Sequence, residues 1–507
     1  MRRVLPVLLL AFCLLLGGCA GEPEAEPTPS PTPSSDVVEE QAEFALACYP
    51  AAGFHPITGE NRTNLSLGGL VYEGLYTLNQ QFQPLEQLCT AGTQAADGLS
   101  WTFTLRTGVT FSDGSPLTAA EVKASLDLAR TSANYSARLS DITSVTAGEG
   151  TVTVTLSRAN GNLPALLDIP IVKETGGVPL GTGPYVLSGS GEEWVLTARQ
   201  GWWQGEELSL QTIPLRAIQE ADDLIHAFDT RDIALVSTDL TGTNALGFSG
   251  SFDTVDYPTS VMLYVGFNTR SGPCQTAGVR QALVRAFDRS AVSTALYSSH
   301  AQPTALPISP ASPYYSEELD QKLEYSPQQA AELLTQAGWS KGESGWTRGR
   351  ESLSLTFVAP ADNPTRVSAA QHLAGGLTDL GLQVDLKLLA WDDYVAALEG
   401  GDFDLYLAEV RLTADFDLTA LITAGGSLNY GGYADAQAAQ LLQTYRAAVV
   451  QGREQSGLRL YERLAEEPPF AVLCFKNWSV LTQWNRVSGL TPTQQNVFYG
   501  FAHWDIA

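Results

Sequence analysis

The sequence predicts a large α/β protein, because strand patterns and capped helices alternate along most of its 507 residues. Residues 101–105 (WTFTL) and 151–157 (TVTVTLS) alternate apolar and polar side chains, which is typical of half-buried strands. Residues 261–267 (VMLYVGF) and 470–475 (FAVLCF) are continuous apolar runs, which are typical of more deeply buried strands.

Helices are marked by the residues at their ends. Thr118 and Glu121 form a capping-box pattern that begins one helix. Ser326, with Pro327 in the first helical position, begins a second helix. A third helix is expected over 279–289, where apolar residues recur every four positions.

The first 18 residues have the order of a secretory signal, with two arginines, an apolar run over 4–16 and two glycines before Cys19. That run is shorter than the roughly 20 residues that cross a membrane, so removal of residues 1–18 is expected. The ending LGGC resembles the lipobox of bacterial lipoproteins, in which the cysteine sulfur takes a diacylglyceryl group. Cys19 is therefore the predicted lipidation site; ordinary secretion with a free Cys19 thiol is the alternative.

Residues 19–43 combine this cysteine with a segment rich in Pro, Glu, Ser and Thr. Such a composition cannot bury enough apolar surface to fold, so we expect a disordered tether. The 29 basic and 55 acidic residues give a net charge of -26, which argues against a nucleic-acid partner. The same charge would repel anionic lipid, so the lipid at Cys19 would have to hold the protein to the membrane.

The chain has six cysteines, of which Cys13 would leave with the predicted signal and Cys19 would carry the predicted lipid. Cys48, Cys89, Cys274 and Cys474 remain, and they permit either disulfides in one of three pairings or buried thiols. No CxxC pair occurs and the five histidines are scattered, so no metal site and no cofactor are expected.

Two segments carry a long ordered string of motif residues: 71–78 (VYEGLYTL) and 97–130 (DGLSWTFTLRTGVTFSDGSPLTAAEVKASLDLAR). This string resembles the family 5 solute-binding proteins of ABC importers, which bind oligopeptides, dipeptides or nickel complexes. Further segments follow in the family's order: 181–185 (GTGPY), 266–269 (GFNT), 279–282 (VRQA), 310–314 (PASPY) and 325–338 (YSPQQAAELLTQAG). The resemblance extends over residues 44–507.

The resemblance implies a two-lobed clamshell of the periplasmic-binding-protein type, with the ligand between the lobes. The chain would cross the hinge near 264–270 and 474–480. The implied boundaries are 44–67, 180–264 and 478–507 for lobe I, 68–179 for a subdomain appended to lobe I, and 265–477 for lobe II.

Peptide-binding members of the family carry an Ala/Gly-Asp pair whose aspartate meets the α-ammonium group of the ligand. The matching residues are Ala414 and Asp415, within 402–433. A carboxylate in a closed cleft gains a strong charge-assisted hydrogen bond from an ammonium group. The alternative is that Asp415 pairs with a neighbour such as Arg411.

Other candidate ligand-binding residues follow from the same comparison. The family commonly has Gly-Trp where this chain has Arg411-Leu412, and Arg411 would either bind a ligand carboxylate or brace the acidic loop. Trp391 matches a family tryptophan near the cleft, with core packing as its alternative. Asn429 and Tyr433 are further candidates, with an exposed loop as their alternative.

The resemblance implies a binding protein that captures short peptides outside the cell and delivers them to an ABC permease. We expect a monomer on the outer face of the cytoplasmic membrane of a Gram-positive-type envelope. The sequence contains no G-x-S-x-G, H-E-x-x-H or P-loop motif, so no motif of these kinds indicates an enzyme. The alternatives are the same fold binding a chelated metal, an oligosaccharide or a signalling peptide, and an exported lipid-anchored hydrolase.

Overall fold

The computed structural model describes residues 43–507. The predicted signal segment, the lipidation site Cys19 and all but the last residue of the predicted tether lie outside these residues. Within the described part, helices alternate with strands that form six sheets, which confirms the mixed α/β class. Over the same residues, every helix is too short or too polar to cross a bilayer.

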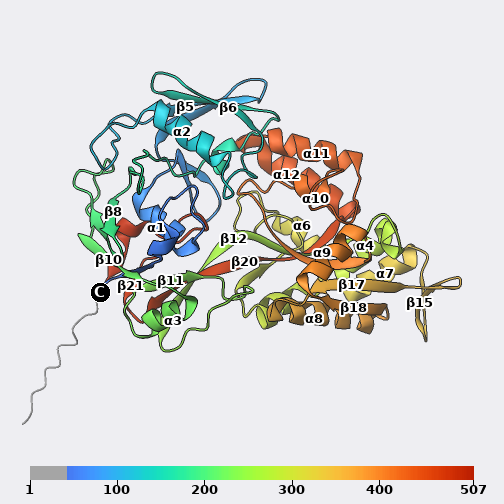
Figure 1. Cartoon of the computed structure of the whole chain (residues 1–507). Helices are drawn as coiled ribbons and strands as arrows, with labels where there is room; N and C mark the ends of the chain where they lie inside the picture. Colours follow the sequence, from blue (N-terminus) through green and yellow to red (C-terminus); the bar gives the residue numbers. More distant parts are fainter. Residues whose placement is uncertain (1–42) are drawn as a thin grey trace, which may run out of the picture. The chain divides into compact units, whose positions relative to one another are not determined.

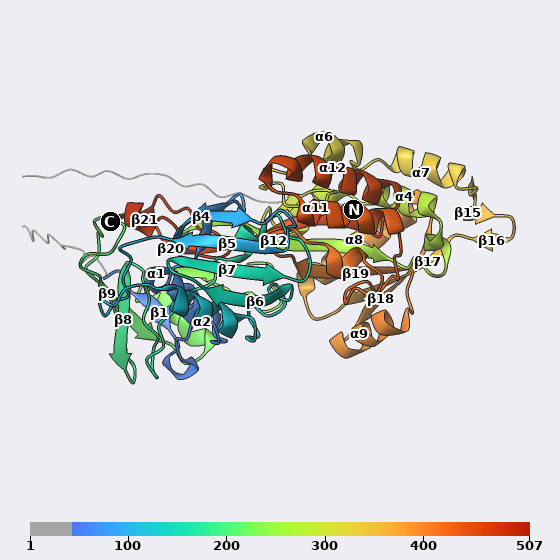
Figure 2. The same cartoon turned by 90° about the horizontal axis from the view of Figure 1, so that it is seen from above.

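A seven-stranded sheet contains the two longest strands, β12 and β20, which run antiparallel side by side (Figures 1 and 2). They include both of the apolar runs predicted as buried strands. Short β13 (Ala301–Pro303) also pairs with β20. The strand order is β11 (Leu235–Thr238), β20 (Phe470–Gln483), β12 (Phe252–Phe267), β19 (Leu405–Arg411), β17 (Ser354–Pro360), β18 (Gln383–Leu389).

Buried side chains form two main regions along these strands. We call the region formed mainly by residues 44–257 and 480–504 the first core, and that formed mainly by 262–475 the second core. The change from one core to the other falls after Tyr257 in β12, where the pairing with β20 becomes irregular up to Met262. Irregular pairing bends a strand, so this is the place where the two cores are joined. The lobe boundaries given above stay a prediction.

The first core is built from two four-stranded sheets and three helices. One sheet has the order β1 (Leu46–Cys48), β10 (Thr212–Ala217), β9 (Glu193–Ala198), β8 (Tyr185–Ser190). The other has the order β4 (Cys89–Gln94), β5 (Ser100–Leu105), β7 (Thr151–Leu156), β6 (Ile142–Ala147). The helices are α1 (Arg62–Val71), α2 (Ala119–Ala129) and α3 (Ala221–Asp229). Strands β5 and β7 are those predicted from alternation, and the predicted capping box begins α2.

The second core places helices around β17, β18 and β19. These helices are α4 (Ala277–Ala286), α5 (Arg289–Ala291), α6 (Glu317–Lys322), α7 (Pro327–Gln336), α8 (Pro364–Leu380), α9 (Trp391–Gly400), α10 (Thr419–Ile422), α11 (Ala436–Ala447) and α12 (Val450–Glu466). Ser326 caps α7 as predicted, through the backbone N–H of Gln329 at 3.3 Å. Helix α4 is shorter than the predicted 279–289, because Phe287 has extended backbone angles.

Short strands complete the described chain: β2 (Tyr76–Leu78), β3 (Pro84–Glu86), β14 (Ser340–Gly342), β15 (Gly345–Arg348), β16 (Glu351–Ser352), β21 (Val487–Ser488) and β22 (Asp505–Ile506). The four cysteines in this part of the chain are free and buried. Of the two readings left open by the sequence, the structure therefore has buried thiols.

Candidate functional site

A cavity of about 1140 Å³ lies where the chain passes from one core to the other. Strands β12 and β20 contribute Tyr257, Ser260 and Trp478 to its wall. The first core adds parts of α1 and the segments around Tyr135 and Asp168, and the second core adds residues from 410 to 428. Sites for drug-sized ligands are typically about 300–1,000 Å³, so this cavity has room for a larger solute.

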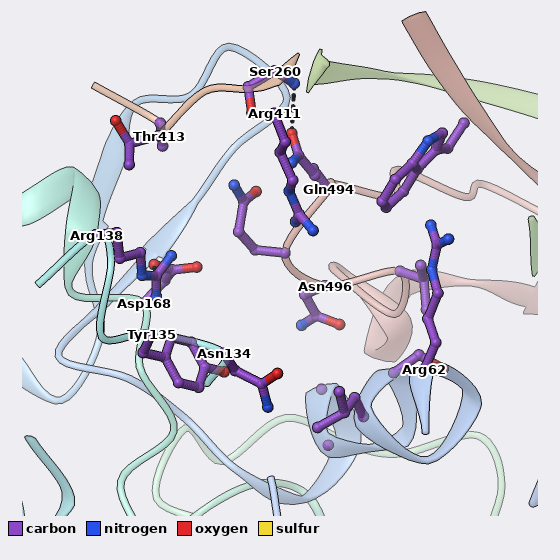
Figure 3. Close-up of a pocket in the computed structure, with 18 of the residues that line it drawn as sticks. Arg62, Asn134, Tyr135, Arg138, Asp168, Ser260, Arg411, Thr413, Gln494 and Asn496 are labelled. Atoms are coloured by element: carbon purple, nitrogen blue, oxygen red, sulfur yellow. Dashed lines mark hydrogen bonds and ion pairs between the residues drawn. The ribbon is translucent and has the colours of Figure 1, made fainter. Parts of the chain in front are cut away.

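The C-terminal segment 494–496 brings three amide side chains to the wall (Figure 3). The Gln494 Oε1 accepts a hydrogen bond from the Ser260 backbone N–H at 2.6 Å, which ties this segment to β12. The Gln495 Oε1 is buried and has no hydrogen-bond partner within residues 43–507. Amides both donate and accept, so this wall suits the peptide groups of a ligand.

Charged side chains in the lining are mostly arginines, although the chain as a whole is strongly acidic. Four arginines and three carboxylates line the cavity: Arg62, Arg138, Arg158, Arg411, Glu73, Asp168 and Asp417. Arg138 Nη2 lies 2.9 Å from Asp168 Oδ1, and Arg158 Nη2 lies 2.8 Å from Asp141 Oδ1. Over the described part of the chain, Arg62 and Arg411 have no ion pair.

Arg411 is the last residue of β19, and it is exposed to solvent. The surrounding walls nonetheless displace bulk water, and this burial is the main cause that lowers the pKa of Arg411. The positive charges of Arg62 and Arg138 lower this pKa further, while Asp168 opposes them. The three arginines therefore repel one another across the cavity.

Glu73 lines the cavity, but its carboxylate is held by hydrogen bonds from the protein itself. Its carboxylate accepts hydrogen bonds from Thr182 Oγ1 at 2.6 Å, Trp203 Nε1 at 2.7 Å and Gln204 Nε2 at 3.0 Å. Burial raises the pKa of Glu73 to about 6, and these hydrogen bonds work in the opposite direction. Its role is therefore to hold the wall in place.

Glu73 is expected to make stability depend on pH. Its pKa is about 6 in the folded chain against 4.5 for an ordinary glutamate, so its favourable contribution to stability is present below pH 4.5 and is lost as pH rises through 6. That difference corresponds to about 2 kcal/mol. Between pH 4.5 and 7, the unfolding free energy of the wild type should therefore fall by about 2 kcal/mol more than that of Glu73→Gln, measured in urea. Parallel pH curves would contradict this.

Asp415 lies just after β19 and is 2% exposed. It lines a second, small cavity of about 60 Å³ that shares several wall residues with the large one. Asn160 Nδ2 donates to Asp415 Oδ2 at 3.0 Å, and Thr413 Oγ1 donates to Asp415 Oδ1 at 2.5 Å. No ion pair with Arg411 is present within residues 43–507.

Asn160 belongs to a set of contacts that bridges the two cores beside the small cavity. Arg446, at the end of α11, forms an ion pair with Asp141 of the first core and another with Asp417, with Nε 3.2 Å from Oδ2. The Gly161 N–H also donates to the Arg446 carbonyl at 2.7 Å. We call this set, with residues 141, 160, 161, 415, 417 and 446, the latch.

The remaining predicted site residues lie outside the cavity lining, except for Arg411. Trp391 begins α9, is 52% exposed, and has its ring 5.8 Å from that of Tyr394. The side-chain amide of Asn429 is taken up by backbone groups of Thr423 and Tyr433. Tyr433 is buried in the second core. The structure thus places Arg411 in the large cavity and Asp415 in the adjacent small one.

Several lining residues were not identified from the sequence, above all Arg62 and Trp478. The Arg62 Cζ lies 3.7 Å from the centre of the Trp478 ring, and the Arg411 Cζ lies 5.3 Å from it. The one available signal was the expected hinge crossing at 474–480, because an aromatic residue there would face the cleft. Arg62 follows an N-cap asparagine and has no local signature of a ligand contact.

The chain matches the sequence profile of the bacterial extracellular solute-binding proteins, family 5, over residues 83–431. It is 26% identical over 348 residues to the glutathione-binding protein GsiB of Salmonella choleraesuis (strain SC-B67), covering 65% of this chain and 66% of that protein. It is 24% identical over 315 residues to the oligopeptide-binding protein AppA of Bacillus subtilis (strain 168), covering 59% and 57%. Each match spans less than two thirds of the relative's length.

Solved structures agree with the chain over more of its length. An ABC transporter substrate-binding protein from Sinorhizobium meliloti superposes with a TM-score of 0.75 at 21% identity, covering 92% of this chain and 99% of that one. AppA from Bacillus subtilis, solved with a nonapeptide, gives a TM-score of 0.61 at 21% identity and the same coverage. These likenesses confirm the predicted two-lobed clamshell fold. With a family profile matched over well more than half of its residues, the chain belongs to the bacterial extracellular solute-binding proteins of family 5.

Proposed function

We propose that the chain captures short peptides outside the cell and delivers them to an ABC permease, without catalysis. Membership of a solute-binding family supports a binding role. The names of two relatives, a glutathione-binding and an oligopeptide-binding protein, support a peptide as the solute. The observation that carries the proposal is the large cavity between the two cores, with amide and charged groups in its wall.

The two lobes proposed from the sequence would close on the ligand by bending at the irregular part of β12 and β20. The latch supports this, because it joins groups of one core to groups of the other next to the cavity. A ligand that contacts both walls would favour the closed arrangement over the open one. Closing would also remove the ligand from water.

Asp415 is proposed to receive the α-ammonium group of the peptide. Its carboxylate has the small cavity beside it and accepts hydrogen bonds from Asn160 and Thr413. Buried Arg453 donates to the Asp415 backbone carbonyl and not to the carboxylate, which within residues 43–507 has no directly paired positive charge. An ammonium group entering from the large cavity would supply that charge.

Native mass spectrometry of the freshly purified chain tests the proposed function, because a closed cleft retains its ligand. We expect bound peptides, which then serve as ligands in calorimetry. Asp415→Ala should lose about tenfold more affinity for peptides with a free amino group than for their N-acetylated forms. Equal losses would contradict the role of Asp415, and a bound sugar or chelated metal would contradict the peptide class.

Cys19 lies outside the described residues, and its lipidation is part of the proposal. A lipid there, followed by a tether, would keep a monomeric binding protein beside its permease on the outer face of the cytoplasmic membrane. A Gram-positive-type envelope is proposed with it. Incorporation of labelled palmitate into the full chain would test the anchor, and an unlabelled chain would contradict it.

A further inference from the structure

Two arginines from different cores meet at one aromatic ring in the cavity wall. Arg62 is the first residue of α1, and Arg411 is the last residue of β19. Trp478 lies in β20, at the passage between the cores, with its ring 6.5 Å from that of Tyr257 in an edge-on arrangement. Both guanidinium groups pack against the Trp478 ring. Figure 3 shows Arg62 and Arg411 extending into the cavity from different elements.

Packing on the ring holds these two groups without neutralising them. A guanidinium group above an aromatic face keeps its N–H donors free at its edge. Within residues 43–507, neither Arg62 nor Arg411 donates a side-chain hydrogen bond or forms an ion pair, whereas Arg138 has Asp168 beside it. The edges of both groups are therefore available to a ligand.

The other carboxylates of the lining are not available to pair with them. Glu73 is held by Thr182, Trp203 and Gln204, and Asp417 is held by Arg446. Asp417 also accepts a hydrogen bond from the Thr419 backbone at 3.0 Å. This part of the cavity thus concentrates positive charge inside a chain with a net charge of -26.

We propose that Arg411 and Arg62 form a subsite for a free carboxylate group of the ligand. Planar guanidinium groups bind carboxylates through paired N–H donors, and a negative charge between them would relieve their repulsion. The subsite deepens the proposed function and rests on it, because it selects among solutes that the cavity admits. The carboxylate belongs either to the C-terminus of a peptide or to an acidic side chain.

Because Arg62 comes from the first core and Arg411 from the second, a carboxylate between them also bridges the two walls. The ligand charge would then favour the closed arrangement directly. Asp415 lies four residues after Arg411, in the adjacent cavity, so opposite charges of one ligand can be received by different parts of the same loop.

The test uses the mature chain and three tripeptides: Ala-Glu-Ala, its C-terminal amide, and Ala-Gln-Ala. We expect Arg411→Gln to weaken binding of Ala-Glu-Ala about 10- to 100-fold. The wild type should prefer Ala-Glu-Ala over the one peptide that lacks the bound carboxylate, and the variant should lose this preference. Loss of preference over the amide identifies the C-terminus as the bound group, and loss of preference over Ala-Gln-Ala identifies the side chain. Arg62→Gln should also weaken binding of Ala-Glu-Ala and remove the preference. It replaces Arg411→Gln in the test if that variant does not fold.

Arg348→Gln is the matched control, because Arg348 also packs on a tryptophan, with Cζ 4.7 Å from the Trp339 ring, but lies outside the cavity. It should bind as the wild type does. Equal affinities of the wild type for all three peptides, or unchanged affinities in both cavity variants, would overturn the subsite while leaving peptide capture intact.

Binding of succinate and of its diamide tests the subsite without a peptide. It therefore distinguishes failure of the subsite from failure of the proposed peptide capture. In a ligand-observed NMR titration, we expect succinate to bind the wild type, succinamide to bind at least tenfold more weakly, and Arg411→Gln to lose the difference. Succinate binding that depends on Arg411, with no peptide binding, would support the subsite and overturn peptide capture. Succinate binding that is unaffected by the variants would overturn the subsite.

Discussion

Replacing Lys476 with methionine is expected to lower the free energy of unfolding by roughly 3 kcal/mol. Lys476 lies in β20 at the passage between the cores and is 1% exposed. Its Nζ lies 2.7 Å from Asp239 Oδ2 and 3.4 Å from Glu409 Oε2. Methionine keeps the apolar packing but leaves two carboxylates without their cation. The effect falls at the low end of the usual range, because these carboxylates are 16% and 24% exposed.

Urea unfolding at pH 7 measures this effect. Lys322→Met is the control, since Lys322 makes an exposed ion pair with Glu318 at the surface and its loss should leave the unfolding midpoint unchanged. Adding Glu409→Gln to Lys476→Met should recover part of the loss, because one unpaired charge is removed. Similar unfolding midpoints for the Lys476 and Lys322 variants would show that the buried Lys476 does not stabilise the fold.

The sequence predicts local elements well where their signals are local. The capping box at Thr118 begins α2, and the alternating segments became β5 and β7. The apolar run 261–267 is only the end of β12, which starts at Phe252. The earlier half of β12 mixes polar residues with Pro258, and it is extended because it pairs with residues 477–483 of β20, more than two hundred positions away. Such pairing has no local signature.

The site could be predicted only where a motif or a strand end marked it. Arg411 was identified because it stands where the family commonly has Gly-Trp, just before the Ala-Asp motif, and it does line the cavity. Arg62 and Trp478 come from elements remote in sequence, and only the fold brings them together. The Asn160 contact to Asp415 joins residues 255 positions apart, so no spacing argument could anticipate it.

Arg446→Ala is expected to weaken ligand binding about 100-fold, because it removes the central cation of the latch. Arg446 has a side chain that is 6% exposed, between Asp141 of the first core and Asp417 of the second. Without it, Asp141 would keep only Arg158 and Asp417 would have no ion pair within residues 43–507, so closing the cleft would bring these carboxylates together near Asp415 against their repulsion. Calorimetry with a ligand recovered from the purified chain measures the change.

Arg463→Ala is the matched control, because Arg463 pairs with Asp435 at 2.6 Å and with Glu466, both within the second core. It should leave affinity unchanged, since its ion pairs are the same whether the cleft is open or closed. If both variants lose affinity equally, the effect of Arg446 comes from general destabilisation and not from the latch.

Gly161→Ala tests the latch through a steric clash, without changing any charge. A Cβ at Gly161 would lie 2.3 Å from the Ala448 carbonyl oxygen and 2.6 Å from that of Ala447, so the two segments would have to move apart. Because Gly161 belongs to the first core side and Ala448 to the second, each side can keep its own packing while the closed arrangement is lost. Affinity should therefore fall with little change in the urea midpoint. Wild-type affinity in Gly161→Ala would mean that ligand binding does not require this contact between the two cores.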